Sequence, residues 1–306
     1  MKFDWIYQGA GQKTVKEFLR QEHLPRRFIA RLKYHGGDIQ RNGESVTVRA
    51  LLKPGDQVSI IAPDEVGHDT VIPSYEPIEI VYEDRDILVI NKPDGLLSIP
   101  SRANPNQTVA NRVKGYYVRK GYADQVIHIV TRLDRNTTGL MLIAKHRLAH
   151  ALLDQQLQAK AVQRYYQALS SQAGYWPDQG LIEAPIARDE DSIITRRVHV
   201  SGQYAATEWW IQARYGQAAL VKLQLHTGRT HQIRVHMAHQ GSPLIGDDLY
   251  GGPLSPWIHR QALHCNELKF QQPFTQAEIH LLQPLPEDML NWIKANQKED
   301  MRYGNL

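Results

Sequence analysis

Apolar residues follow one spacing near the start of the chain and another in the rest, which predicts two structural parts. Helical spacing in 14–23 and 24–37 predicts two short helices, the first capped by Thr14 and the second followed by two glycines. An Asn-Gly turn in 38–48 and alternating apolar residues in 52–61 predict short strands. Two helices followed by strands form a complete small module.

After residue 78 the pattern changes to apolar, β-branched runs with helices between them. Strands come in groups instead of alternating strictly with helices, which favours an α+β domain with a mixed, largely antiparallel sheet. The expected strands are 78–84, 86–92, 139–146, 165–171, 206–215, 219–226, 262–270 and 277–282, and the expected helices are 109–121, 147–158, 230–241 and 287–297.

The segment between the two parts is polar, contains proline and lacks periodicity, so it is expected to be a linker. The predicted organisation is a small helix-helix-strand domain over 1–62, a linker over 63–77 and a larger α+β domain over 78–306.

The composition is that of a globular chain with a core. Of 306 residues, 42% are hydrophobic and 22% are charged, near the averages for globular proteins. No apolar run approaches the length of a membrane span, and the first residues hold no signal-type apolar segment. Cys265 is the only cysteine, so no internal disulfide forms and a reducing, cytoplasmic setting is expected.

Positive charge is concentrated in the small domain. The net charge is +4, yet residues 1–62 hold 11 Lys and Arg against 6 Asp and Glu, while the remainder holds 25 against 26. A basic module on a nearly neutral body favours a polyanionic partner, although a solvated positive face explains the charge equally well.

The stretch TRLDRNTTGLMLIAK (131–145) places a carboxylate between two arginines at the mouth of an apolar strand. An aspartate flanked by arginines is usually part of a weak surface ion pair. Here Asp134 comes just before small residues that let another strand approach closely. A neighbouring arginine favours the ionised carboxylate, so Asp134 is expected to act as a nucleophile or a base.

Two further stretches carry polar side chains that could belong to a site. Residues 226–252 include Arg229 and Arg234, although a basic amphipathic helix would explain both without a function. Arg164 and Tyr166 fall on one face of a predicted strand, and such a tyrosine taken alone is more often a core residue. The histidines of this region match no metal-ligand spacing, so no metal site is expected.

Five ordered motifs resemble those of the RluA-type pseudouridine synthases, and five in order are very hard to obtain by chance. They are ILVINKPDGLLSIPS at 87–101, TRLDRNTTGLMLIAK at 131–145, QRYYQAL at 163–169, LHTGRTHQIRVHMAHQGSPLIGDDLYG at 225–251 and ALHCNELKF at 262–270.

The small domain carries a resemblance of its own. Residues 13–62 resemble an RNA-binding domain of a ribosomal small-subunit protein and of several RNA-modifying enzymes, through RR at the start of the second helix, GG at its end, RNGE in the turn and KPGDQVSI. The whole chain is therefore most similar to the RluD-like subgroup, which carries such a module.

The resemblance implies roles for individual residues. Asp134 matches the essential aspartate of the family, Tyr166 the tyrosine that stacks on the target base, and Arg132 an arginine that helps to displace it. Arg234 matches the basic residue that pairs with the aspartate, with Arg229 as the alternative. Catalytic roles are thus expected for Asp134, Tyr166 and Arg234. RNA contacts are expected for Arg132, Arg229, Arg26, Arg27, Arg31 and Lys33.

The chain departs from the family pattern at a few positions, none of which removes the aspartate. Thr131 stands where the family usually has His, which changes a local hydrogen bond or RNA contact. The other departures are Asn136 for Asp, Thr137-Thr138 for Thr-Ser and Arg164 for Lys. Lys92 belongs to a motif that is structural in the family.

The reaction implied by the resemblance isomerises a uridine of RNA. The N1–C1′ bond breaks, the uracil turns and C5 joins C1′, so no cofactor and no metal is implied. A uridine within a helix must first be flipped out. The implied partner is RNA, with large-subunit ribosomal RNA ahead of transfer RNA, no membrane is involved, and a monomer is expected.

Two other hypotheses compete with this one. A non-catalytic RNA-binding or ribosome-assembly protein on the same fold predicts damage at Asp134 or Tyr166, and both are intact. A glycoside hydrolase needs two carboxylates flanking the scissile bond. The motifs supply one aspartate among arginines, and Asp247 and Asp248 are expected to lie in a structural turn.

Overall fold

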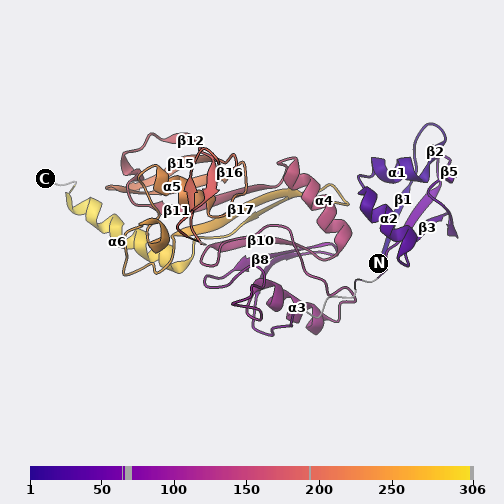
Figure 1. Ribbon diagram of the computed structural model, residues 1–306, viewed down its shortest axis with the longest axis horizontal. Helices are drawn as coiled ribbons and strands as arrows, with labels where there is room; N and C mark the ends of the chain where they lie inside the picture. Colours follow the sequence, from indigo (N-terminus) through magenta and orange to yellow (C-terminus); the bar gives the residue numbers. More distant parts are fainter. Residues whose placement is uncertain (64, 66–70, 193, 304–306) are drawn as a thin grey trace.

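The computed structural model describes the backbone of residues 1–63, 65, 71–192 and 194–303 and shows an elongated molecule (Figure 1). The N-terminal part forms one end and helix α6 (Glu287–Tyr303) the other, with a large sheet between them.

The N-terminal part is a small sheet packed against two helices. Its elements are β1 (Lys2–Ile6), β2 (Lys13–Thr14), α1 (Val15–Gln21), α2 (Arg26–Tyr34), β3 (Asp38–Arg41), β4 (Glu44–Ser45), β5 (Leu51–Leu52) and β6 (Gln57–Ile61). The predicted cap of α1 is present, because the Thr14 hydroxyl accepts a hydrogen bond from the Glu17 N–H and the Glu17 carboxylate accepts one from the Thr14 N–H. Strand β1 was not predicted, since its pairing with β6 lies outside any local pattern.

The central sheet contains ten strands among the described residues. They are β7 (Glu79–Glu83), β8 (Ile87–Lys92), β9 (His128–Ile129), β10 (Thr138–Ala144), β11 (Gln163–Ser170), β12 (Gln179–Glu183), β15 (Ala206–Tyr215), β16 (Ala218–Leu225), β17 (Leu263–Gln271) and β18 (Glu278–Leu282). The main path runs β12-β15-β16-β11-β17-β10-β8-β7, with β18 beside β17 and β9 beside β10. Among the described strands of this sheet, only β10 and β17 pair in parallel, so the predicted mixed, largely antiparallel α+β fold is confirmed.

Helices and short ribbons complete this part. They are α3 (Val109–Lys120), α4 (Arg147–Gln158), β13 (Ile186–Arg188), β14 (Arg196–Val198) and α5 (Gln232–His239). The helix predicted from 230 begins at Gln232. The strands β9, β12, β13 and β14 were not predicted, because they are short or lie at an edge and depend on their partners.

The centre of the sheet requires a glycine. Gly139, at the start of β10, has a φ of 109°, and a Cβ there would lie 2.2 Å from the carbonyl oxygen of Cys265 on β17. The absence of a side chain lets the parallel β10–β17 pair form. This close approach fixes where β10 begins, and therefore where the preceding turn with Asp134 lies.

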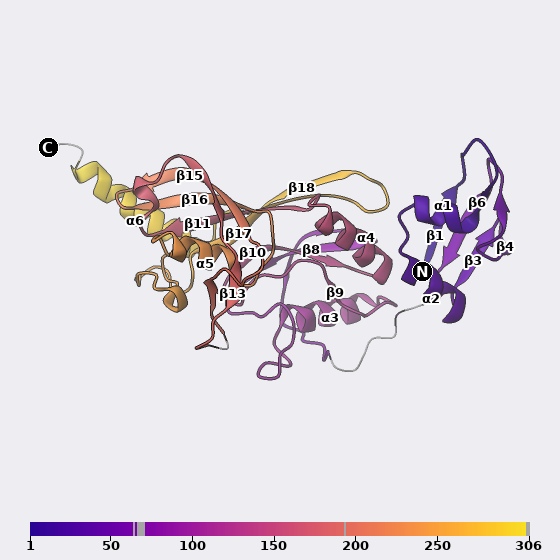
Figure 2. The same ribbon diagram turned by 45° about the horizontal axis from the view of Figure 1, so that its top comes forward.

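An aromatic cluster joins the N-terminal part to the central sheet. The Phe3 ring of β1 lies 5.1 Å from the ring of Phe274 and 5.2 Å from that of His146, and the Arg85 guanidinium covers both phenylalanines. Figure 2 shows α4 and the β17–β18 hairpin on the side of the sheet that faces the N-terminal part. Leu148 of α4 belongs to the same apolar core as the N-terminal helices.

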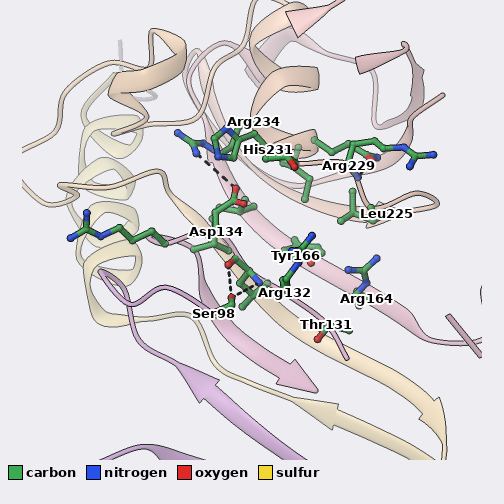
Figure 3. A pocket seen from close by; sticks show the side chains of 18 of the residues that line it. Ser98, Thr131, Arg132, Asp134, Arg164, Tyr166, Leu225, Arg229, His231 and Arg234 are labelled. Carbon is green, nitrogen blue, oxygen red and sulfur yellow. Dashed lines mark hydrogen bonds and ion pairs between the residues drawn. The ribbon is translucent and has the colours of Figure 1, made fainter. Parts of the chain in front are cut away.

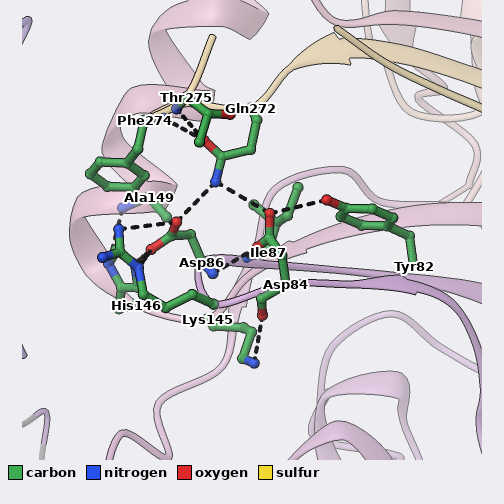
Figure 4. Close-up of polar contacts among 11 residues, drawn as sticks. Tyr82, Asp84, Asp86, Ile87, Lys145, His146, Ala149, Gln272, Phe274 and Thr275 are labelled. Carbon is green, nitrogen blue, oxygen red and sulfur yellow. Dashed lines mark hydrogen bonds and ion pairs between the residues drawn. The ribbon is translucent and has the colours of Figure 1, made fainter. Parts of the chain in front are cut away.

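A buried polar network supports this junction (Figure 4). The Asp86 carboxylate accepts hydrogen bonds from Gln272 at 2.9 Å and from Arg85 at 2.7 Å, and lies 3.0 Å from Nε2 of His146. Nδ1 of His146 accepts from the Ala149 N–H and caps α4. His146 therefore donates through Nε2, and its orientation is fixed from both sides.

Candidate active site

A cavity of about 620 Å³ opens beside the central sheet and contains the polar residues singled out by sequence (Figure 3). It is lined from β11, from the start of α5 and from the segment before β10. The charged or aromatic lining residues are Arg132, Asp134, Arg135, Arg164, Tyr166, Arg229, His231 and Arg234. Asp134, Tyr166 and Arg234, far apart in sequence, thus share one cavity.

Hydrogen bonds hold the segment that carries Asp134. The Ser98 hydroxyl donates to the Leu133 carbonyl at 2.7 Å and accepts from the Leu133 N–H. The buried Thr131 hydroxyl accepts from the Leu142 N–H at 2.9 Å and ties the segment to β10. The residue that replaces the family histidine therefore makes a local backbone contact.

The turn that follows Asp134 is held by a buried ammonium. Nζ of Lys92 donates to the carbonyls of Pro93, Leu96 and Arg135, each at 2.8 Å. Burial lowers the pKa of Lys92 to about 7, opposed by the charges of Asp94 and Asp134. Three acceptors require the three N–H groups of the ammonium, so the geometry favours the protonated form.

Arg234 is fixed by a carboxylate that sequence analysis assigned to a structural turn. Its Nε and Nη2 donate to Asp247 at 2.8 and 2.7 Å, and the Asp247 side chain is fully buried. Its Nη1 lies 3.8 Å from Oδ2 of Asp134. Burial acts to lower the pKa of Arg234, but Asp247 and then Asp134 outweigh it and raise this pKa. Arg234 and Asp247 are separated by 12 residues, a spacing that matches no motif and no helical pairing, so this ion pair was not predicted from the sequence.

The choice between the two candidate arginines is resolved geometrically. Nε of Arg229 donates to the Tyr204 carbonyl at 3.0 Å, on an exposed rim, whereas Arg234 is the arginine within 4 Å of Asp134. The Asp134 side chain is 28% exposed, enough to meet a ligand while ion-paired.

An aromatic residue supports Arg234 from the other side. The guanidinium carbon lies 4.9 Å from the ring centroid of Tyr250, whose hydroxyl lies 2.8 Å from Nδ1 of His231. Burial lowers the pKa of His231. His231 also has a left-handed backbone with φ of 57°, a conformation that non-glycine residues hold only where the surroundings impose it. Neither Tyr250 nor His231 was predicted to belong to the site.

Tyr166 presents an apolar ring in the wall of the cavity. Its side chain is almost completely buried on β11, and burial raises its pKa, followed by the effect of the Cys265 thiol. It is therefore a neutral phenol whose ring lines the cavity.

The remaining predicted cations fall into two groups. Arg132 lines the cavity, is exposed, and makes no hydrogen bond or ion pair with any residue that the structure describes. The α2 residues Arg26, Arg27, Arg31 and Lys33 are also exposed but lie in the N-terminal part, away from the cavity. The structure therefore separates them from the catalytic candidates.

No group of three or more His, Cys, Asp and Glu side chains placed to hold a metal ion occurs among the described residues. Within the same residues, no helix has the length and apolar character needed to cross a membrane.

Comparisons with known proteins assign the class. Residues 86–239 match the family described as RNA pseudouridylate synthase. The chain is 43% identical over 282 residues to the uncharacterized RNA pseudouridine synthase YjbO of Bacillus subtilis, covering 92% of this chain and 99% of that protein. It is 38% identical over 298 residues to ribosomal large subunit pseudouridine synthase D of Haemophilus influenzae, covering 91% and 90%.

The fold agrees with this assignment. The structure of human RNA pseudouridylate synthase domain containing 4 superposes with a TM-score of 0.57 at 24% identity, covering 69% of this chain and 90% of that chain. The chain belongs to the RNA pseudouridine synthase family. Within this family it is of the RluA type and RluD-like, and it is an enzyme that forms pseudouridine. The non-catalytic alternative is not favoured.

Proposed function

We propose that this enzyme isomerises uridines of large-subunit ribosomal RNA and that Asp134 is its reacting carboxylate. Relatives from Haemophilus influenzae and Haemophilus ducreyi carry the name ribosomal large subunit pseudouridine synthase D, the latter 37% identical over 281 residues. The observation that carries the residue assignment is the Asp134–Arg234 ion pair, which shares one cavity with the Tyr166 ring.

The cavity suits a nucleotide flipped out of a helix. Flipping costs a few kcal/mol, and stacking on an aromatic ring returns about 1–3 kcal/mol per base. Tyr166 provides that ring, and the exposed, unpaired Arg132 is placed to contact the backbone or the vacated stack. Walls of Leu225, Ile233 and Leu263 limit water around the base.

Asp134 acts on the sugar of the flipped nucleotide. Arg234 lies beside its carboxylate and is itself held by Asp247, so that Asp134 has a rigidly placed partner. In one route the carboxylate forms a bond to C1′ as N1 leaves, and this bond breaks when C5 attacks C1′. In the other it removes a proton from the sugar and returns that proton to the same carbon when C5 joins C1′. In both routes the N1–C1′ electron pair leaves with N1, a C5–C1′ bond forms, C5 loses its proton and N1 gains one.

The N-terminal part, residues 1–62, is the proposed second RNA contact, joined by the linker 63–77 to the catalytic domain 78–306. Arg26, Arg27 and Arg31 of α2 are exposed, with no ion pair to any described side chain. Replacing all three with Glu should weaken RNA binding and reduce its salt dependence. The rate at saturating enzyme should stay unchanged, and a lower saturated rate would show that this helix acts on the chemistry instead.

The proposed setting is the cytoplasm, where a monomer meets assembling ribosomal RNA. The direct test uses RNA from cells with and without the gene, mapped for carbodiimide-dependent reverse-transcriptase stops. Complementation uses the wild type, Asp134→Asn and the matched control Asp154→Asn, an exposed aspartate of α4.

Stops in large-subunit ribosomal RNA that disappear with the gene should return with the wild type and the control but not with Asp134→Asn. Stops confined to transfer RNA would show that the substrate is transfer RNA and not large-subunit ribosomal RNA. An unchanged pattern, together with purified protein that leaves these RNAs unmodified, would overturn the proposal.

A further inference from the structure

Arg164 is a cation inside the cavity that has no partner. Its Nε is buried without a hydrogen-bond acceptor, and its guanidinium makes no hydrogen bond or ion pair within the described part of the chain. Buried polar groups are almost always hydrogen-bonded, so an unpaired guanidinium in a cavity indicates a ligand that supplies acceptors.

Arg164 lies close to the ring of Tyr166 in the wall of the cavity. It lies on β11 two residues before Tyr166, so both side chains point to the same face of the sheet. A Cβ on Gly228 would lie 3.4 Å from Nη2 of Arg164, so the backbone of this loop lies directly beside the guanidinium. In Figure 3, Tyr166 lies between Asp134 and Arg164.

Among the residues that the structure describes, no carboxylate forms an ion pair with Arg164. Its charge acts on the Tyr166 hydroxyl and the Cys265 thiol, and burial raises the pKa of both, in the case of Cys265 to about 12. Asp134 is engaged with Arg234 instead. The guanidinium donors therefore face the cavity and its contents.

We propose that Arg164 binds the carbonyl oxygens of the flipped uracil and stabilises the negative charge that the base acquires when N1 leaves C1′. This inference rests on the proposed roles of Asp134 and Tyr166. Asp134 acts at the sugar, and the base extends from the sugar across the Tyr166 ring toward Arg164. On cleavage, the electron pair of the N1–C1′ bond spreads over O2 and O4, and N–H donors aimed at these atoms lower the barrier.

The same contact serves both orientations of the base. To bring C5 to the place of N1, the ring turns about the axis through N3 and C6, which exchanges O2 and O4. A guanidinium next to one carbonyl oxygen before the turn meets the other one after it. Arg164 thus retains the detached base without opposing its rotation.

The test compares Arg164→Met with the wild type on two transcripts of an RNA that the wild type modifies, one with uridine and one with 5-fluorouridine. Fluorine withdraws electrons from the ring, so the negative charge on departing 5-fluorouracil needs less stabilisation by the protein. The measurements are the single-turnover rate of N1–C1′ cleavage and the RNA dissociation constant.

The expected result is a rate on uridine lower by about 10²–10³-fold with nearly unchanged RNA binding. On 5-fluorouridine the loss should be smaller by at least about tenfold. Arg164→Lys, which keeps the charge, should recover part of the rate on uridine. The matched control is Lys269→Met, a cation on the opposite face of the same sheet, where Glu267 keeps Lys222 as a partner.

Equal losses on the two transcripts would overturn the proposal, because lost packing affects both alike. Weaker RNA binding with a normal single-turnover rate would also overturn it and assign Arg164 to a phosphate. If the wild type itself modifies neither transcript, the proposed function fails first, and the two failures remain distinguishable.

Discussion

Nη1 of Arg234 lies 3.8 Å from Oδ2 of Asp134, while Nε and Nη2 of the same guanidinium are hydrogen-bonded to Asp247. One arginine therefore joins a fully buried carboxylate to a carboxylate that reaches the cavity. The buried partner uses two donors and leaves the third side of the fork for Asp134. This arrangement positions the proposed reacting group through Arg234, whose own orientation is set by the buried Asp247.

Replacing Asp134 with Asn should abolish pseudouridine formation while leaving RNA binding intact. The amide keeps the shape but cannot act as a nucleophile or base, so we expect a loss of at least about 10³-fold in single-turnover rate. Rate and RNA affinity would be measured on the same transcript. A variant that retains near-normal rate would remove Asp134 from the chemistry.

Replacing Asp247 with Asn should reduce both stability and activity. Breaking a buried charge pair costs about 3–5 kcal/mol, because Arg234 keeps its charge and loses its partner. Urea unfolding and single-turnover rate are the measurements. Asp248→Asn is the matched control, since Asp248 is adjacent but exposed. Equal effects of the two substitutions would contradict the positioning role of Asp247.

Replacing Lys92 with Met should loosen the turn after Asp134. Three carbonyl groups lose their donor, and each buried acceptor left unpaired costs about 1–3 kcal/mol. We expect a lower unfolding midpoint and a slower single turnover with unchanged RNA binding. Lys120→Met, at the exposed end of α3, serves as control. Full stability in Lys92→Met would show that the buried charge is not needed to hold the turn.

Glu65 should make stability depend on acid pH. It binds His128 at 3.0 Å and the Arg147 N–H at 2.7 Å. Burial acts to raise the Glu65 pKa, but these contacts outweigh it and lower the pKa from 4.5 to about 2. The carboxylate therefore contributes about 3 kcal/mol above the unfolded-state pKa, and this is lost as pH falls through the interval toward 2.

The check is urea unfolding of the wild type and Glu65→Gln across this acid range. The difference between them should be large near pH 5 and shrink as pH falls toward 3. Glu44→Gln, at an exposed position of β4, is the control. A difference that does not change with pH would mean that the charge of Glu65 contributes nothing.

Local patterns in the sequence predicted much of the fold. The Thr14 cap, the position of α4 and the strand after Asp134 follow from spacing over a few residues, and the structure confirms them. Strand β1 and the contact of Phe3 with Phe274 could not be predicted, because they depend on partners far away along the chain.

The site, like the fold, could be predicted only in part from the sequence. Motif resemblance located Asp134, Tyr166 and Arg234, and the structure places them in one cavity, while their roles remain predictions. The Arg234–Asp247 pair was missed because both residues stand where an amphipathic helix and a turn explain them locally. Only the folded geometry shows that Arg229 faces Tyr204 and Arg234 faces Asp134.

The stacked rings of Phe3 and Phe274 have a consequence for substrate selection. Because side-chain packing joins the N-terminal part to the sheet, the separation between α2 and Asp134 is set by the fold instead of by the length of a tether. An RNA that contacts both must present its uridine at one fixed offset from the bound region. Moving the uridine a few nucleotides along an otherwise identical RNA would then place it outside the cavity while the N-terminal part stays bound.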